Sequence, residues 1–222
     1  MKDLNLIYLF ETITNIWDSE EIQISAYPTS EYIKDCGTPK RFKEVENDLK
    51  NKKVYANSYK YKQKILFLDR DGTLIKCKKG EYIISPDQVE LNSKILNKYK
   101  KYTNLGFLPV VVTNQPQLSF GLITLNELDL IHCKIQDLLY EANLNPIFRF
   151  IFCPHHPHSR HKKEVDFLKF VCNCRKPEIG MYQELSRWVD IDISKSLMIG
   201  DNIKDLEFAN NCGIKYKNID HL

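Results

Sequence analysis

Residues 65–73, Ile65-Leu-Phe-Leu-Asp69-Arg-Asp71-Gly72-Thr73, form an apolar run that enters a sharp turn through two carboxylates. The run is short, continuous and followed by a turn signal, so it predicts a buried strand. Side chains two apart on a strand share a face, so we expect Asp69 and Asp71 to converge and Arg70 to point away. Converging carboxylates repel each other unless a cation or a functional proton stabilises them. The stretch predicts a reactive pair, and an ordinary strand-to-turn Asp-Gly is the alternative.

From Lys64 onward, apolar runs alternate with helical patterns, as in a parallel sheet with crossover helices. The predicted strands are Ile65 to Asp69, Pro109 to Asn114, Phe148 to Cys153, Ser196 to Asp201 and Ile214 to Ile219. The predicted helices carry the face Leu128, Ile131, Ile135, Leu138 and Ala142, the face Tyr182, Leu185 and Val189, and the run Lys204 to Asn211. The predicted fold class is α/β, a doubly wound parallel sheet whose ligands bind at the carboxyl ends of the strands.

The composition is that of a globular protein, with 222 residues, 43% of them hydrophobic and 27% charged. The length allows one domain of ordinary size, with about sixty residues left over. The net charge of +3 is too small to indicate nucleic-acid binding. No apolar stretch approaches the roughly 20 residues of a membrane span. Without a signal-peptide pattern, and with Cys36, Cys77, Cys133 and Cys212 scattered singly, we expect a cytoplasmic protein with reduced thiols.

Three further segments supply groups suited to phosphate chemistry. Pro109-Val-Val-Val-Thr113-Asn114-Gln115 ends a predicted strand in a hydroxyl and two amides, which are neutral donors for phosphate oxygens. Arg175-Lys176-Pro177 places two cations just before a predicted helix, where anions are favoured. The stretch from Ser196 to Asp205 ends a strand at Asp201, a third carboxylate, and oxygen ligands of this kind suit Mg²⁺. Ordinary turn chemistry and a solvated basic pair are the alternatives for the first two.

In this order and spacing the four segments resemble the haloacid dehalogenase superfamily, from about residue 64 to the end. The resemblance implies a magnesium-dependent phosphatase that forms an aspartyl-phosphate. Its catalytic residues would be the nucleophile Asp69, the acid/base Asp71, and the phosphate ligands Thr113 and Lys176. Substrate-binding roles would fall to Asn114, Gln115 and Arg175, and Mg²⁺ would be held by Asp69, the Asp71 carbonyl and Asp201, with Asp205 behind them. We therefore expect a phosphatase domain over residues 64–222 and an N-terminal segment with a linker over 1–63.

A cysteine-rich loop follows the third predicted strand. Cys153-Pro154-His155 and Cys172-Asn173-Cys174 together offer three thiolates and an imidazole, a complete set for tetrahedral structural Zn²⁺. A disulfide is the main competitor, but a Cys-x-Cys pair is poorly placed to bridge itself. His156, His158 and His161 are further candidates in the loop, although solvent-exposed loop histidines are the simpler interpretation. Zinc would fix the loop whose end carries Arg175 and Lys176.

The pattern Cys-Pro-His-His-Pro followed by Cys-x-Cys-Arg-Lys-Pro is similar to the D-glycero-D-manno-heptose 1,7-bisphosphate and histidinol-phosphate phosphatases. Only short segments separate the first three strands, so little or no cap domain is expected. This chain departs from the family in three places. Phe120 stands where an arginine is common before Gly121, Asn202 stands where lysine or serine is common, and Asn92-Ser93 replaces Pro-Gly. These changes bear on specificity more than on the reaction.

The N-terminal stretch Ala26-Tyr-Pro-Thr-Ser-Glu-Tyr-Ile-Lys-Asp35-Cys-Gly37-Thr38-Pro39-Lys-Arg-Phe resembles the last part of a sugar-nucleotide nucleotidyltransferase. In that family an aspartate at the place of Asp35 helps to bind metal. The first 71 residues contain Gly37 alone among glycines, so no glycine-rich phosphate loop is available and transferase activity is not expected. The stretch suggests a functional link to a nucleotidyltransferase, or a helical arm packed on the core.

The leading functional hypothesis is removal of the C7 phosphate from heptose 1,7-bisphosphate, a small phosphorylated sugar, for a bacterial surface glycan. Neither a nucleic-acid nor a membrane partner is expected. Histidinol-phosphate phosphatase is the first alternative. A nucleic-acid 3′-phosphatase shares the same motifs, but the sequence shows no supporting basic or aromatic stripe. A catalytically inactive zinc domain would not need the intact set of catalytic residues.

Overall fold

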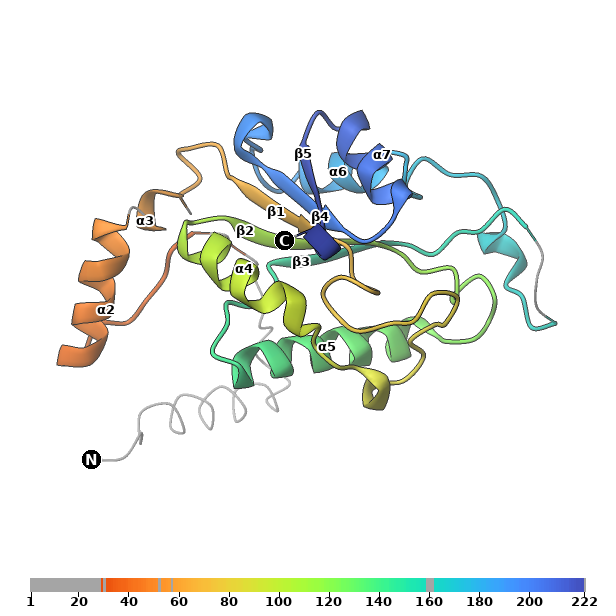
Figure 1. The fold of residues 1–222 in the computed structure, drawn as a ribbon, viewed down its shortest axis with the longest axis horizontal. Coiled ribbons are helices and arrows are strands. Elements are labelled where there is room, and N and C mark those ends of the chain that lie inside the picture. The colour runs from red at the N-terminus through yellow and green to blue at the C-terminus, as the bar shows by residue number, and fades with distance from the viewer. Residues whose placement is uncertain (1–28, 30, 52, 57, 159–161, 222) are drawn as a thin grey trace, which may run out of the picture.

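A five-stranded, fully parallel sheet forms the centre of the computed structural model, which describes residues 29, 31–51, 53–56, 58–158 and 162–221. The strand order is β3-β2-β1-β4-β5 (Figure 1). The strands are β1 Ile65–Leu68, β2 Leu108–Asn114, β3 Arg149–Cys153, β4 Leu197–Gly200 and β5 Lys215–Asn218. All five predicted strands are present, and the α/β prediction is confirmed.

Helices cover both faces of this sheet, α4 and α5 on one side and α6 and α7 on the other (Figure 1). The described α-helices are α2 Pro39–Lys50, α3 Lys53–Ala56, α4 Ser93–Asn104, α5 Leu125–Glu141, α6 Gly180–Leu185 and α7 Ile203–Asn211. Single 3₁₀ turns occur at Pro86–Gln88, Asp166–Leu168, Ile193–Lys195 and Ile219–His221. The sheet is therefore doubly wound, as predicted. None of the helices in the described ranges is both long and apolar enough to cross a membrane.

The alternating side chains of β1 build the two halves of the core. Leu66 and Leu68 pack with the α4 and α5 side of the sheet, whereas Ile65 and Phe67 pack with the α6 and α7 side. On α5 the buried face ends at Leu139, because Leu138 is only half-buried and Ala142 lies past the helix end. The predicted periodicity was right, with an error of one turn at the C-terminal end.

The connection between β1 and β2 contains no inserted domain. It consists of the turn after β1, the 3₁₀ turn Pro86–Gln88 and helix α4, so the prediction of little or no cap holds. The segment from Asp87 to Leu91, which has a strand-like pattern, contributes only one bridge, between Ile75 and Leu91. The carboxyl ends of the strands are thus reached directly from the surrounding loops.

Candidate active site

The end of β1 places Asp69 in an ion-paired, buried cluster. Nζ of Lys176 lies 2.5 Å from Oδ1 of Asp69 and 2.6 Å from Oδ1 of Asp205, and all three residues are 5% exposed or less. Lys176 lies at the end of the loop that follows β3 and carries the four candidate zinc ligands, called here the zinc-type loop. Asp205 lies in the first turn of α7. One ammonium between two buried carboxylates leaves one negative charge without a compensating cation.

The electrostatics of this cluster follow from that imbalance. Burial raises the pKa of Asp69 to about 8, against the opposing effect of Lys176. Burial lowers the pKa of Lys176, but Asp69 and Asp205 outweigh it, so the net shift of that pKa is upward. The lysine therefore stays charged, and Asp69 needs a further positive charge nearby to be a carboxylate at neutral pH.

Asp201 completes a group of three acids at the carboxyl ends of β1 and β4. One carboxylate oxygen each of Asp69, Asp201 and Asp205 lie within 4.8 Å of one another. Gly72 makes room for Asp201, because its φ is +85° and an added Cβ would lie 2.4 Å from Oδ2 of Asp201. Hard oxygen donors with an excess negative charge fit Mg²⁺. The residues present therefore fit the predicted magnesium site, and Asp205 belongs closer to it than the sequence suggested.

Asp71 lies in a different environment from Asp69. Arg70 donates through Nε to Oδ1 of Asp71 at 3.0 Å and through Nη2 to Oδ2 at 2.9 Å. Nε2 of Gln115 donates to the same Oδ2 at 2.8 Å. The expectation that Arg70 points away was wrong, because β1 ends at Leu68 and strand alternation does not extend into the turn. Arg70 is completely buried and forms a two-bonded pair with Asp71.

The polar end of β2 mainly organises other active-site groups. Thr113 is buried, and its Oγ1 accepts a hydrogen bond from Nε2 of Gln115 at 2.8 Å. Asn114 accepts from the backbone N–H of Lys176 at 2.9 Å and donates to its carbonyl at 3.2 Å. Gln115 is fully buried with both amide hydrogens donated, to Asp71 and to Thr113.

Arg175 donates through Nη1 to the carbonyl of His155 at 3.0 Å.

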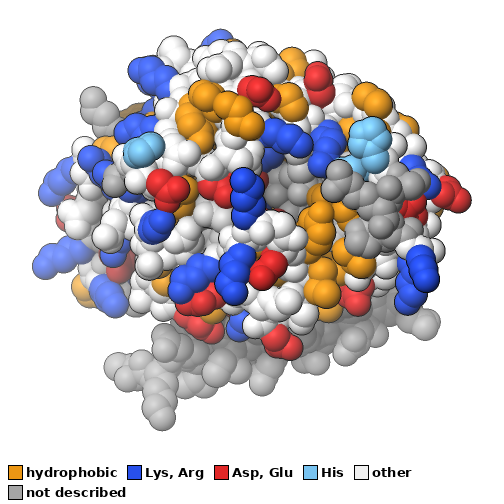
Figure 2. Space-filling model, turned by 45° about the vertical axis from the view of Figure 1, so that its right-hand side comes forward, with side chains coloured by type: hydrophobic (Ala, Val, Ile, Leu, Met, Phe, Trp, Pro, Cys, Tyr) orange, Lys and Arg blue, Asp and Glu red, His pale blue; other side chains and the backbone are white. Residues whose placement is uncertain are grey.

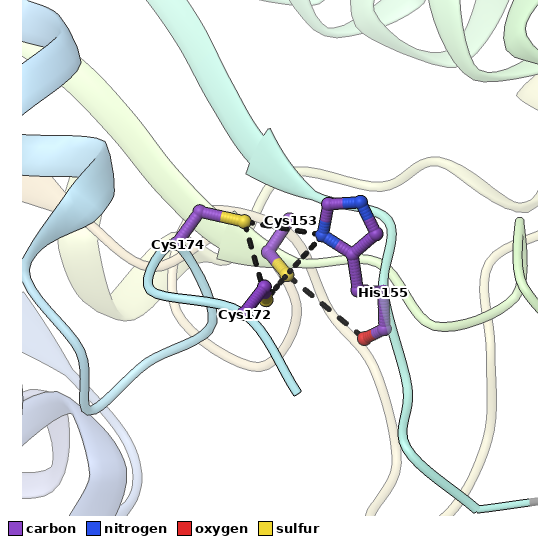
Figure 3. Close-up of side chains that lie close together, drawn as sticks. All are labelled: Cys153, His155, Cys172 and Cys174. Carbon is purple, nitrogen blue, oxygen red and sulfur yellow. Dashed lines mark hydrogen bonds between the residues drawn. The ribbon is translucent and has the colours of Figure 1, made fainter. Parts of the chain in front are cut away.

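The predicted zinc ligands converge on one point (Figure 3). Sγ of Cys172 lies 3.5 Å from Sγ of Cys153 and 3.4 Å from Sγ of Cys174, and Nδ1 of His155 lies 3.2 Å from Sγ of Cys174. These separations exclude a disulfide and approach the edges of a tetrahedron built on bonds of about 2.3 Å. Hydrogen bonding with Cys153 lowers the pKa of Cys174 to about 5, which favours a thiolate. The donor set fits structural Zn²⁺.

The other loop histidines are placed differently. His156 is buried against Phe120, with ring centroids 5.0 Å apart, and does not join the four ligands. Its Nδ1 contacts the carbonyl of His158 at 3.1 Å. His161 lies outside the described residues. Among the described histidines of the loop, His155 is therefore the candidate imidazole ligand.

The residues that depart from the family pattern have structural roles here. Phe120 is 1% exposed and packs between Tyr82 and His156, so it joins two loops instead of facing a substrate. Asn92 caps α4 and donates to the Gly72 carbonyl at 3.1 Å, which fixes the turn that holds Asp71. Asn202 caps α7 and donates to Oδ1 of Asp201 at 3.1 Å.

The doubly wound parallel sheet, the carboxylates Asp69 and Asp71 after β1 and the buried Lys176 beside Asp69 define the class of protein. This is a phosphatase of the haloacid dehalogenase type, a phosphoric monoester hydrolase. The chain belongs to the polynucleotide kinase 3 phosphatase family, whose model matches residues 64–221.

Relatives with stated activities share most of this region. The D-glycero-beta-D-manno-heptose-1,7-bisphosphate 7-phosphatase of Escherichia coli O6:H1 is 31% identical over 144 residues, 65% of this chain and 72% of the relative. The D-glycero-alpha-D-manno-heptose-1,7-bisphosphate 7-phosphatase of Photorhabdus laumondii is 31% identical over 153 residues, 69% of this chain and 80% of the relative. The crystal structure of D,D-heptose 1,7-bisphosphate phosphatase from B. bronchiseptica, complexed with magnesium and phosphate, superposes with a TM-score of 0.59 at 28% identity, covering 69% of this chain and 79% of that one.

The nucleotidyltransferase-like stretch is described only in part. Thr38 caps helix α2, which begins at Pro39 and has no buried residue, and Asp35 pairs with Arg41 at 2.6 Å. The matched family model begins at residue 64, so the transferase-like stretch lies outside it. Residues 1–28, 30, 52 and 57 of the expected N-terminal segment lie outside the described residues.

Proposed function

We propose that this chain hydrolyses a sugar phosphate monoester through a phosphoryl group carried on Asp69. The buried Asp69–Lys176–Asp205 cluster carries the proposal, because it fixes one carboxylate oxygen at a strand end beside a lysine suited to phosphate oxygens. Asp69 attacks phosphorus, the bond from phosphorus to the leaving oxygen breaks, and Asp71 gives that oxygen its proton. Asp71 then accepts a proton from water, which attacks phosphorus, releases inorganic phosphate and restores Asp69.

The remaining residues hold the transferring group. Thr113 Oγ1 and Lys176 Nζ are the proposed donors to its oxygens, and Asn114 fixes the lysine backbone. Mg²⁺, when bound by Asp69, Asp201 and the Asp71 carbonyl, would supply charge compensation for the phosphoryl oxygens and for the buried carboxylate that Lys176 leaves uncompensated. Cys153, His155, Cys172 and Cys174 would hold Zn²⁺, which would fix the loop that ends in Arg175 and Lys176 without taking part in bond cleavage.

The proposed substrate is D-glycero-D-manno-heptose 1,7-bisphosphate, with cleavage at C7. The named relatives act on this compound, as either the alpha or the beta anomer, and the site lacks a cap, so the loops must recognise the sugar. Arg175 reaches the zinc-type loop with one guanidinium nitrogen and has further donors for a second phosphate. Histidinol phosphate would instead bring an amine towards Arg175 and Lys176, which repel it.

A nucleic-acid 3′-end is the less favoured substrate. Basic and acidic side chains are interspersed on the face seen in Figure 2, without a continuous basic stripe. The deciding experiment is kcat/KM with Mg²⁺ for both heptose bisphosphate anomers, histidinol phosphate and a 3′-phosphorylated oligonucleotide. We expect a heptose anomer to be preferred. A clear preference for either of the other substrates would overturn the sugar assignment and leave the phosphatase chemistry intact.

The division at residue 63, the link to a sugar nucleotidyltransferase and a cytoplasmic location are further proposals. The first two rest on the catalytic groups all lying beyond Lys64 and on the sequence pattern around Asp35. The proposed location rests on the sequence, in which Cys36, Cys77, Cys133 and Cys212 are scattered singly, as expected of reduced thiols.

A further inference from the structure

Asp71 is held by a buried network that the proposed reaction does not explain. Its carboxylate accepts two hydrogen bonds from Arg70 and one from Gln115, at distances between 2.8 and 3.0 Å. Arg70 and Gln115 are both completely buried, although each carries a polar side chain that is costly to bury without partners. Among the described residues, Asp71 is the acid with which Arg70 forms an ion pair.

Arg70 and Gln115 each contact a further buried polar side chain, His132 and Gln117 respectively. Nη1 of Arg70 lies 3.4 Å from Nε2 of His132, a residue of α5 that stacks on Phe150 with ring centroids 4.2 Å apart. Burial and the neighbouring Arg70 lower the pKa of His132 to about 3, so the imidazole is neutral and can accept a hydrogen bond. On the other side, Nε2 of Gln117 donates to Oε1 of Gln115 at 2.5 Å.

These hydrogen bonds distinguish the two carboxylate oxygens of Asp71. A carboxylate has about four lone-pair positions. Both positions on Oδ2 of Asp71 are taken, by Arg70 and Gln115, whereas Arg70 takes only one position on Oδ1. The Asp71 side chain keeps 24% of its surface exposed, so the open position can face a substrate.

We propose that Arg70 and Gln115 are positioning residues that hold Asp71 so that its Oδ1 carries the proton given to the leaving oxygen. The inference rests on the proposed role of Asp71 as acid and does not depend on which sugar phosphate is hydrolysed. Arg70 donates to Asp71 and lies against His132, whereas Gln115 donates to Asp71 and also to Oγ1 of Thr113. The effect of Arg70 is therefore confined to the step that needs the proton, whereas Gln115 also supports the proposed phosphate donor Thr113.

The test compares two small substrates of similar shape, benzyl phosphate and 4-nitrophenyl phosphate. The benzyl alkoxide must be protonated as it leaves, whereas 4-nitrophenolate leaves without a proton. The ratio kcat/KM reports the steps up to loss of the leaving group, so each variant is compared with wild type on each substrate. General acid catalysis contributes about 10²–10⁴-fold, which sets the scale of the loss.

For Arg70→Met we expect kcat/KM for benzyl phosphate to fall at least about tenfold more than for 4-nitrophenyl phosphate, mainly through kcat. Arg70→Lys should recover part of the benzyl loss, because it keeps a buried donor. Gln115→Leu leaves no unpaired buried charge, but it also removes the hydrogen bond to Thr113. It should therefore reduce kcat/KM for both substrates, with the larger loss on benzyl phosphate. Arg149→Met is the matched control, since Arg149 stacks on Trp188 at 3.8 Å and does not contact Asp71.

The outcomes separate this inference from the mechanism it rests on. If Asp71→Asn lowers kcat/KM equally for both substrates, the acid role of Asp71 is wrong. If Asp71→Asn is selective but Arg70→Met and Gln115→Leu reduce both substrates equally, as Arg149→Met should, the positioning role is wrong. Should Arg70→Met fail to fold, as judged by its unfolding transition, the comparison of Arg70→Lys and Gln115→Leu with wild type decides the question in the same way.

Discussion

Replacing Lys176 by methionine should destabilise the protein by removing the one ammonium between two buried carboxylates. Asp69 and Asp205 lie 2.5 and 2.6 Å from Nζ, with side chains 8% and 0% exposed. Removing one partner of a buried ion pair costs about 3–5 kcal/mol, because it leaves a charge uncompensated. For a chain of this length that corresponds to a fall in Tm of about 6–20 °C.

The assay is urea and thermal unfolding in magnesium-free buffer, without chelator so that zinc is retained. The loss should be larger at pH 8 than at pH 5, because the raised pKa of Asp69 rises further without Lys176 and a raised carboxyl pKa destabilises the fold as pH increases. Adding Asp205→Asn removes one of the two charges and should recover part of the stability. Unfolding free energies of Lys176→Met within about 0.5 kcal/mol of wild type would refute the account of this cluster.

The protein should carry one zinc ion per chain, because Cys153, His155, Cys172 and Cys174 form a complete ligand set; elemental analysis that finds none after chelator-free purification would exclude the zinc site. The magnesium-free protein should lose stability, relative to its Asp69→Asn variant, as pH rises from about 4 to about 8, since Asp69 holds its proton over this range only when folded. A stability difference that grows in the opposite direction would show that the pKa of Asp69 is not raised. Deleting residues 1–50 should leave hydrolysis of 4-nitrophenyl phosphate largely intact, because the catalytic groups lie beyond Lys64, and a folded but inactive product would show that this segment completes the site.

The sequence predicted the sheet, its helices and the location of the site because hydrophobic periodicity and strand ends determine these features. All five strands lie where apolar runs predicted them, with boundaries shifted by a few residues. The candidate zinc ligands could be predicted from residue types and spacing, because two short motifs on one loop can meet without knowledge of the rest of the fold, and the structure brings the four side chains together.

Side-chain directions beyond the strand ends were not predictable in the same way. The turn after Leu68 breaks strand alternation, so Arg70 folds back onto Asp71, and no periodic rule signals that reversal. The sequence suggested Gln115 as a substrate ligand, and its hydrogen bond to Asp71, 44 residues earlier, could not be foreseen from the sequence. The part played by His132 depends on helix α5 docking against the sheet, which is a tertiary property.

The sequence contains one signal for the position of Asp205. It stands four residues after Asp201, in the first turn of a predicted helix, where a carboxylate accepts backbone N–H groups. In the structure Oδ2 of Asp205 accepts from the backbone of Asp201 and of Asn202 at 3.2 Å, while Oδ1 pairs with Lys176. The same residue therefore fixes the strand end and the active-site lysine.

Turnover by the Asp69→Asn variant tests the central claim most directly. Asparagine keeps the size of the side chain and leaves Asp205 to pair with Lys176, so the variant should fold and bind zinc like wild type. It cannot act as a nucleophile, and kcat with Mg²⁺ and 4-nitrophenyl phosphate should fall by at least about a thousandfold. A folded, zinc-loaded variant with near-normal turnover would contradict the assignment of Asp69 as the residue that carries the phosphoryl group.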